Sequence, residues 1–130
     1  MKKLVIETVV KEVNDDIENI IDKSQFVQEI TETINKTQTY INPSSTFTFE
    51  PFRGGKGVKN IKIISDIPVK MSYTSQADTY NFGCNMKEYT FLGGGDNENR
   101  NSDFIAKYGS ISLQNIDTEK TAHIKIIYTY

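Results

Sequence analysis

The 130-residue chain is poor in the residues that carry metal, thiol and disulfide chemistry. It has one cysteine, Cys84, one histidine, His123, and no tryptophan. One cysteine excludes an intrachain disulfide framework, and one histidine excludes a His-rich metal site. The sequence pairs neither residue with a group that would activate a nucleophile, so we predict a buried structural thiol at Cys84 and a solvent-facing His123. We therefore expect a non-enzymatic protein with no catalytic residue, no metal and no cofactor.

Long apolar runs and a strong net charge are also absent. The formal net charge is −2, which gives no general attraction to nucleic acid or to anionic lipid. Glu7 ends the first apolar run after Leu4-Val5-Ile6, whereas a signal peptide needs about 7–15 apolar residues and a membrane-spanning helix about 18. We expect no nucleic-acid partner, no membrane partner, no signal peptide and no transmembrane segment. The protein is expected to be made in a reducing cytosol, and either to stay there or to be assembled into something larger.

Leucine and alanine, which favour helices, are scarce. The chain has 3 of each, against 17 isoleucines and 13 threonines. Ile and Thr are branched at Cβ, which restricts χ1 and suits the pleated surface of a sheet. An AT-rich genome also raises isoleucine content, but a β-rich fold accounts better for the shortage of leucine. The 7 tyrosines suit both strands and interfaces.

Glycine and proline divide the chain into two regions, because residues 1–40 contain neither. All 8 glycines and all 3 prolines lie in residues 41–130. The first region has five lysines and eight acidic residues, a net charge of −3, and the second has ten basic and nine acidic residues, a net charge of +1. We predict an N-terminal segment, 1–40, that oligomerises or anchors the protein, followed by a β domain, 41–130.

Apolar residues in the first region recur three and four positions apart. This spacing fits the a and d positions of a coiled coil and predicts an amphipathic helix. β-Branched residues at d disfavour parallel dimers and favour higher oligomers, including trimers. Two alternatives remain open: a helix packed on its own domain, and a β-strand over Leu4–Val13. The residues of this predicted oligomerisation or anchoring seam are Ile6, Val10, Val13, Ile17, Ile20, Val27 and Ile34.

The second region alternates apolar and polar residues with a period of two, which predicts strands. The clearest expected strand is the last, with Ala122, Ile124 and Ile126 on one face. We also predict two hairpins, one joining Thr79–Cys84 to Lys87–Leu92 and one closing through the polar loop Asn115–Lys120. The predicted fold is mainly β (α+β), an antiparallel β-sandwich or barrel with an N-terminal amphipathic helical segment. The other expected strands are Thr46–Glu50, Val58–Ser65, Val69–Tyr73 and a strand around Ile111 and Leu113.

Two glycine-led segments, residues 53–59 and 93–103, are candidate contact loops. The first surrounds three glycines with cations, but it lacks the P-loop ending and leads into an expected strand, so a charged turn and an anion contact both remain open. The second offers oxygen ligands without the EF-hand order, so an exposed loop, a partner contact and a calcium site remain open. The candidate contact residues are Arg53, Lys56, Asp96, Glu98, Arg100 and Asp103.

The C-terminal stretch, Gly109–Asn115 followed by Ala122–Tyr130, resembles the closing hairpin of small β-sandwich proteins in tailed-bacteriophage virions. These include head-decoration, head-fibre and tail components. The resemblance implies a structural virion protein, assembled in the host cytoplasm, that docks on copies of itself or on neighbouring virion proteins. No functional residue is carried over from it. The alternatives are a carbohydrate- or ligand-binding β-sandwich module and a small intracellular inhibitor of the immunity-protein type.

Overall fold

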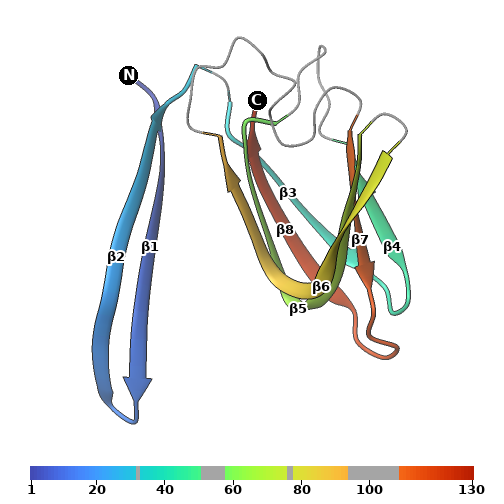
Figure 1. Ribbon diagram of the computed structural model, residues 1–130, viewed down its shortest axis with the longest axis horizontal. Coiled ribbons are helices and arrows are strands. Elements are labelled where there is room, and N and C mark those ends of the chain that lie inside the picture. Colours follow the sequence, from blue (N-terminus) through green and yellow to red (C-terminus); the bar gives the residue numbers. More distant parts are fainter. Residues whose placement is uncertain (32, 51–57, 76–77, 94–108) are drawn as a thin grey trace. The chain divides into compact units, whose positions relative to one another are not determined.

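All regular secondary structure in the described part of the chain is β (Figure 1). The computed structural model describes residues 1–31, 33–50, 58–75, 78–93 and 109–130. The chain divides into two compact units, Met1–Thr33 and Ile34–Tyr130. The prediction of antiparallel β structure is confirmed, and the prediction of an N-terminal helical segment is wrong. Among the described residues there is accordingly no helix of the length and apolarity needed to cross a membrane.

The first unit is a long antiparallel hairpin. β1 (Lys3–Asn14) pairs with β2 (Ile17–Glu29) from Lys3 opposite Glu29 to Asn14 opposite Ile17. Asp15 closes the turn with a positive φ of 53°, a conformation that Asp tolerates better than most residues. The register shifts between Val10 and Lys11, so Ile21 is an extra residue in β2, as in a β-bulge.

The hairpin forms because β-propensity outweighs the helical spacing of the seam. Val and Ile lose χ1 freedom in a helix and pack well on a sheet. Leu4–Val13 lies within β1, so the strand alternative is the one that the structure confirms. The steps of three and four arise because apolar residues occupy both faces of the hairpin, and an odd step changes face in a strand of period two.

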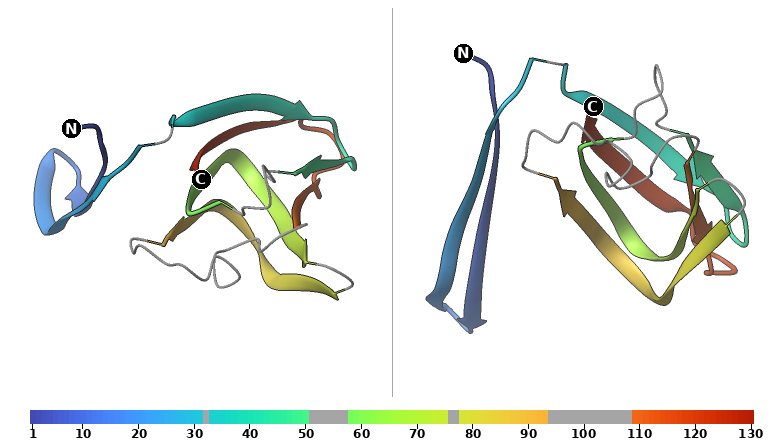
Figure 2. Two further views of the ribbon diagram at one scale, coloured as in Figure 1. Left: turned by 90° about the horizontal axis from the view of Figure 1, so that it is seen from above. Right: turned by 45° about the horizontal axis from the view of Figure 1, so that its top comes forward.

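The second unit is one six-stranded antiparallel sheet. Its path is β3-β8-β5-β7-β4, with β6 paired to the other edge of β5. The sheet curls into a half-barrel (Figure 2). Its strands are β3 (Asn35–Ile41), β4 (Thr46–Phe49), β5 (Asn60–Ser75), β6 (Asp78–Leu92), β7 (Ser110–Asn115) and β8 (Ala122–Thr129).

A bend in β5 produces this curl. Residues 60–65 pair with β8 and residues 69–74 pair with β7. Pro68 lies between the two segments, and it has no N–H to give to a ladder. The Ser65 hydroxyl donates a hydrogen bond to the Ile67 carbonyl at the same place. One strand therefore serves as the centre of both halves of the sheet, where the sequence predicted two separate strands.

Both predicted hairpins of the second unit are wrong. β6 runs unbroken through Asn85 and Met86, which pair with Lys70 and Val69 of β5. β7 and β8 do not pair with each other; each pairs with its own half of β5. In both cases β5 offers a long edge of backbone N–H and C=O groups. Pairing within a local hairpin would leave part of that edge without hydrogen-bond partners.

The core of the second unit lies inside the curl. The expected burial of Ala122, Ile124 and Ile126 on β8 is confirmed. Cys84 is exposed on β6, so the prediction of a buried thiol is wrong, and His123 is exposed as expected. In the part of this unit that the structure describes, the buried apolar side chains are Ile41, Phe49, Val58, Ile61, Ile63, Val69, Met71, Ile111, Leu113, Ala122, Ile124 and Ile126.

Candidate functional site

The hairpin of the first unit exposes an unusual amount of apolar surface. Eight of its Val and Ile side chains are between 45% and 73% exposed. Contiguous exposed apolar surface on a soluble protein commonly marks an interaction site. A two-stranded hairpin alone in water is marginally stable, because it has no second layer on which to pack. The exposed side chains are Val5, Val9, Val10, Val13, Ile17, Ile20, Ile21 and Val27.

The structure divides the predicted seam between the two faces of the hairpin. Residues opposite each other in the register share a face. By this rule Ile6, Val10 and Ile17 lie on one face, and Val13, Ile20 and Val27 lie on the other. Ile34 belongs to the second unit, before β3. The seam is therefore not one stripe, but all of its members except the half-buried Ile6 remain exposed.

One face alternates apolar and charged side chains along β1 with strict regularity. Lys3, Val5, Glu7, Val9, Lys11 and Val13 follow one another on it, and we call this set the alternating face. Its charges are held loosely within the hairpin. Gln25 Nε2 donates to Glu7 Oε1 at 3.3 Å, and Lys11 Nζ lies 3.3 Å from Glu18 Oε2. Such exposed pairs contribute little to stability and leave the groups available to a partner.

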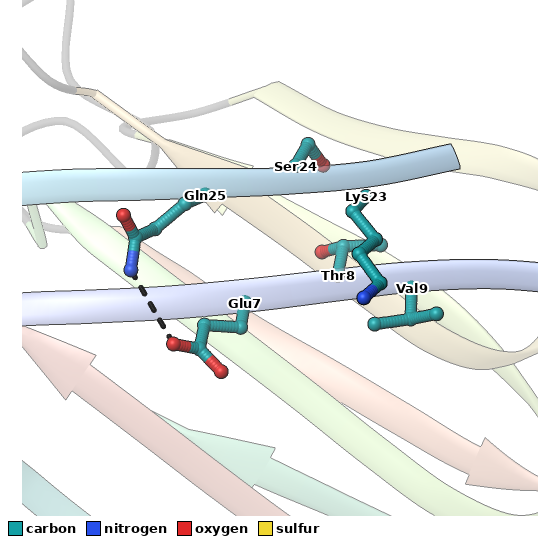
Figure 3. Close-up of a pocket in the computed structure, with 6 residues that line it drawn as sticks. All are labelled: Glu7, Thr8, Val9, Lys23, Ser24 and Gln25. Carbon is teal, nitrogen blue, oxygen red and sulfur yellow. Dashed lines mark hydrogen bonds between the residues drawn. The ribbon is translucent and has the colours of Figure 1, made fainter. Parts of the chain in front are cut away.

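A shallow hollow of about 340 Å³ lies along the middle of the hairpin. Figure 3 shows its lining side chains, with the Gln25–Glu7 hydrogen bond at one end and Lys23 beside Val9 at the other. None of the lining residues is buried, and no set of three or more His, Cys, Asp or Glu that would hold a metal occurs among the described residues. The hollow is therefore an open surface depression with charged, polar and apolar side chains along it. It is lined by Glu7, Thr8, Val9, Lys23, Ser24 and Gln25.

The two outer edges of the hairpin differ. Within the described residues neither β1 nor β2 pairs with any strand beyond its hairpin partner. The outer edge of β2 is interrupted by the extra residue Ile21, and bulges are one of the devices by which proteins block unwanted strand addition. β1 has no extra residue over its 12 positions. The β1 edge is therefore the better template for a further strand.

The second unit has a shallow hollow of about 300 Å³ beside Tyr40. The Tyr40 side chain is 70% exposed, and its ring meets His123 edge to face at 4.7 Å. The Asp66 carboxylate accepts a 2.7 Å hydrogen bond from the backbone N–H of His123. This arrangement offers one aromatic surface with polar neighbours. Sequence reasoning missed the hollow because β3, β5 and β8 supply it from three distant parts of the chain.

The predicted contact residues Arg53, Lys56, Asp96, Glu98, Arg100 and Asp103 lie outside the described residues. Gly93, at the start of the second loop, is described. Its N–H lies 3.0 Å from the Asn60 side-chain oxygen and 2.9 Å from the Lys59 carbonyl oxygen. A Cβ at this position would lie 2.6 Å from that carbonyl oxygen, so glycine is required for this close approach.

Comparisons with known proteins add no identification. No protein-family model matches the chain, no curated protein matches its sequence, and no solved structure matches its fold.

Proposed function

We propose that this chain is a non-enzymatic assembly protein that associates with copies of itself through its N-terminal hairpin. One observation carries the proposal: a two-stranded sheet with exposed Val and Ile on both faces, whose regular edge strand β1 pairs with no strand but β2 among the described residues. An element of this kind gains most from a partner, because association supplies both the missing strands and the missing apolar cover.

The setting that fits this function is the particle of a tailed bacteriophage. Its support is the sequence resemblance of residues 109–130 alone, since β7 and β8 do not form the closing hairpin of that resemblance. Capsid, portal or tail genes beside the gene for this chain would support the virion setting, as would regular particles in negative-stain images of purified protein.

Light scattering on the full chain, from low micromolar to several hundred micromolar, tests the association. We expect a mass that is a multiple of the monomer and that falls to the monomer in the triple variant Val9→Thr, Val13→Thr, Val27→Thr. These changes keep the β-branched shape and remove apolar surface. Ile116→Thr makes the same kind of change at an exposed residue of the second unit and is expected to have no effect. The proposal is contradicted if the wild-type protein has the monomer mass at every concentration. It is also contradicted if the triple variant has the same oligomer mass as the wild type.

A further inference from the structure

We infer that the partner of β1 is β1 of a second copy, paired antiparallel about a two-fold axis at Val9, and this inference rests on the proposed self-association. The two hairpins would form one four-stranded antiparallel sheet. Three or more strands with an apolar face are needed for independent stability. A two-fold contact uses the same surface on both copies, so the sequence of β1 must complement itself when it is reversed.

The alternating face of β1 meets this requirement. With Val9 opposite Val9 of the partner subunit, Glu7 lies opposite Lys11 of the partner subunit and Val5 lies opposite Val13 of the partner subunit. Each charge meets the opposite sign and each valine meets a valine. The two-fold axis repeats each of these pairs. The four-stranded sheet therefore gains two Glu7–Lys11 pairs and two Val5–Val13 pairs in addition to the single Val9–Val9 pair on the axis. Directly opposed side chains of this kind each contribute about 0.2–1 kcal/mol.

The ends of the hairpin complement each other in the same register. The turn is acidic, with Asp15 and Asp16 at its tip, and Lys2 and Lys3 stand at the other end of β1. The antiparallel arrangement brings each acidic turn to the lysines of the partner subunit. A parallel arrangement would bring the two acidic turns together, which like-charge repulsion disfavours.

Neighbouring registers lack this match. A two-fold axis at Glu7 places two Glu7 side chains together and Lys3 opposite Lys11 of the partner subunit. An axis at Lys11 places two Lys11 side chains together. An axis at Thr8 or Val10 keeps the same faces together but sets Glu7 and Lys11 against valines. On the second face, the Val9 register places no like charges opposite each other.

Thiol cross-linking of the full chain tests the register. Each variant carries Cys84→Ser, because the native thiol is exposed. With a short bifunctional thiol reagent, we expect Val9→Cys to cross-link with itself. Val5→Cys alone and Val13→Cys alone are expected to stay uncross-linked, because eight residues of strand, about 27 Å, separate each thiol from its symmetry mate. A mixture of the Val5→Cys and Val13→Cys proteins is expected to cross-link.

Charge reversal gives an independent readout. Glu7→Lys is expected to raise the dissociation constant of the dimer about tenfold, because it places two pairs of like charges in the sheet. Adding Lys11→Glu is expected to recover most of that loss. Asp22→Lys makes the same change of charge on β2, and because β2 lies away from the inferred contact it is expected to have little effect. Far-UV circular dichroism verifies that each variant keeps its β structure.

The outcomes separate this inference from the function on which it rests. A wild-type protein that stays monomeric overturns both. An oligomer that depends on the hairpin valines, but in which Val9→Cys does not cross-link or the mixture behaves like its components, overturns the β1 register and leaves the assembly function standing.

Discussion

At the scale of the residue, Asn115 is a buried polar side chain that connects separate parts of the second unit. Its side chain is fully buried, and its Nδ2 donates to the carbonyls of Lys120 at 2.8 Å and Ile41 at 2.9 Å. Its Oδ1 accepts the N–H of Asp117 at 3.0 Å. One side chain therefore joins the end of β3 to the loop between β7 and β8. Loss of this buried amide would leave several backbone groups without a hydrogen-bond partner.

Asn115→Leu tests this role. We expect the variant to lose about 3 kcal/mol of unfolding free energy. The change keeps a branched side chain of four heavy atoms but removes the hydrogen-bond partner of the Ile41, Asn42 and Lys120 carbonyls and of the Asp117 N–H. Urea unfolding followed by circular dichroism measures the loss. Gln114→Leu, at the exposed neighbouring position of β7, is the matched control and is expected to change stability by less than about 0.5 kcal/mol. Equal effects of the two changes would contradict the role of the buried amide.

Asp117 gives the same loop a dependence on pH. The backbone N–H groups of Glu119 and Lys120 each donate to its Oδ1 at 2.8 Å, and they hold the pKa of Asp117 below its ordinary value of 3.8. A lowered pKa in the folded state means that the charged form favours folding. The charged Asp117 carboxylate therefore stabilises the folded state fully above pH 3.8, and this stabilisation is lost as the pH falls through the lowered pKa.

Asp117→Asn is expected to destabilise the protein near neutral pH and to have no effect at acid pH below the lowered pKa. The reason is that the wild-type carboxyl is then neutral, like the amide. Urea midpoints of both proteins across the acid range measure the convergence. A difference that stays constant with pH would show that the charge of Asp117 plays no part.

At the scale of the element, the sequence predicted strands well where one face is buried and poorly elsewhere. β8 was predictable because Ala122, Ile124 and Ile126 alternate with exposed or half-buried residues over a core. The hairpin hides this pattern, because Val and Ile occupy both of its faces and mimic helical spacing. The alternation from Lys3 to Val13 was nevertheless present in the sequence. Its strict period of two was the available indication of β1.

Long-range pairing set the limit of prediction in the second unit. The bend near Pro68 makes β5 the partner of β6, β7 and β8. No local sequence pattern shows that the two halves of one strand pair with different strands. The Tyr40 hollow depends on the same pairing, so it was equally hidden. The candidate contact loops were chosen by composition alone, and their contact roles remain predictions.

The bulge at Ile21 is expected to prevent a further strand from pairing with the outer edge of β2. Deleting Ile21 removes the extra residue and leaves every other pair of the register in place. We expect the deletion to give a second regular edge and therefore open-ended association in place of a closed dimer. Light scattering and thioflavin T fluorescence measure this against the wild type. A deletion variant of unchanged mass would show that the bulge does not protect the β2 edge.

At the scale of the whole molecule, the two units are stabilised by different means. Among its described residues the second unit encloses twelve buried apolar side chains. Among the described residues of the first unit only Leu4, Gln28 and Ile30 are buried. The free energy of local opening follows the burial around each element. The hairpin is therefore expected to open easily unless association supplies its missing contacts.

Hydrogen exchange at two protein concentrations tests this division. In dilute solution we expect the amides of β1 and β2 to exchange much faster than those of β8. Little of the hairpin is buried, and in the described part of the chain neither of its outer edges pairs with another strand. At high concentration the hairpin amides are expected to slow, those of β1 most, while β8 is unchanged. This pattern would show that assembly completes the fold of the first unit, since the second unit provides an internal reference in the same molecule. A hairpin as protected as β8 in dilute solution would mean that it is stable without a partner, and the physical reason for its association would be lost.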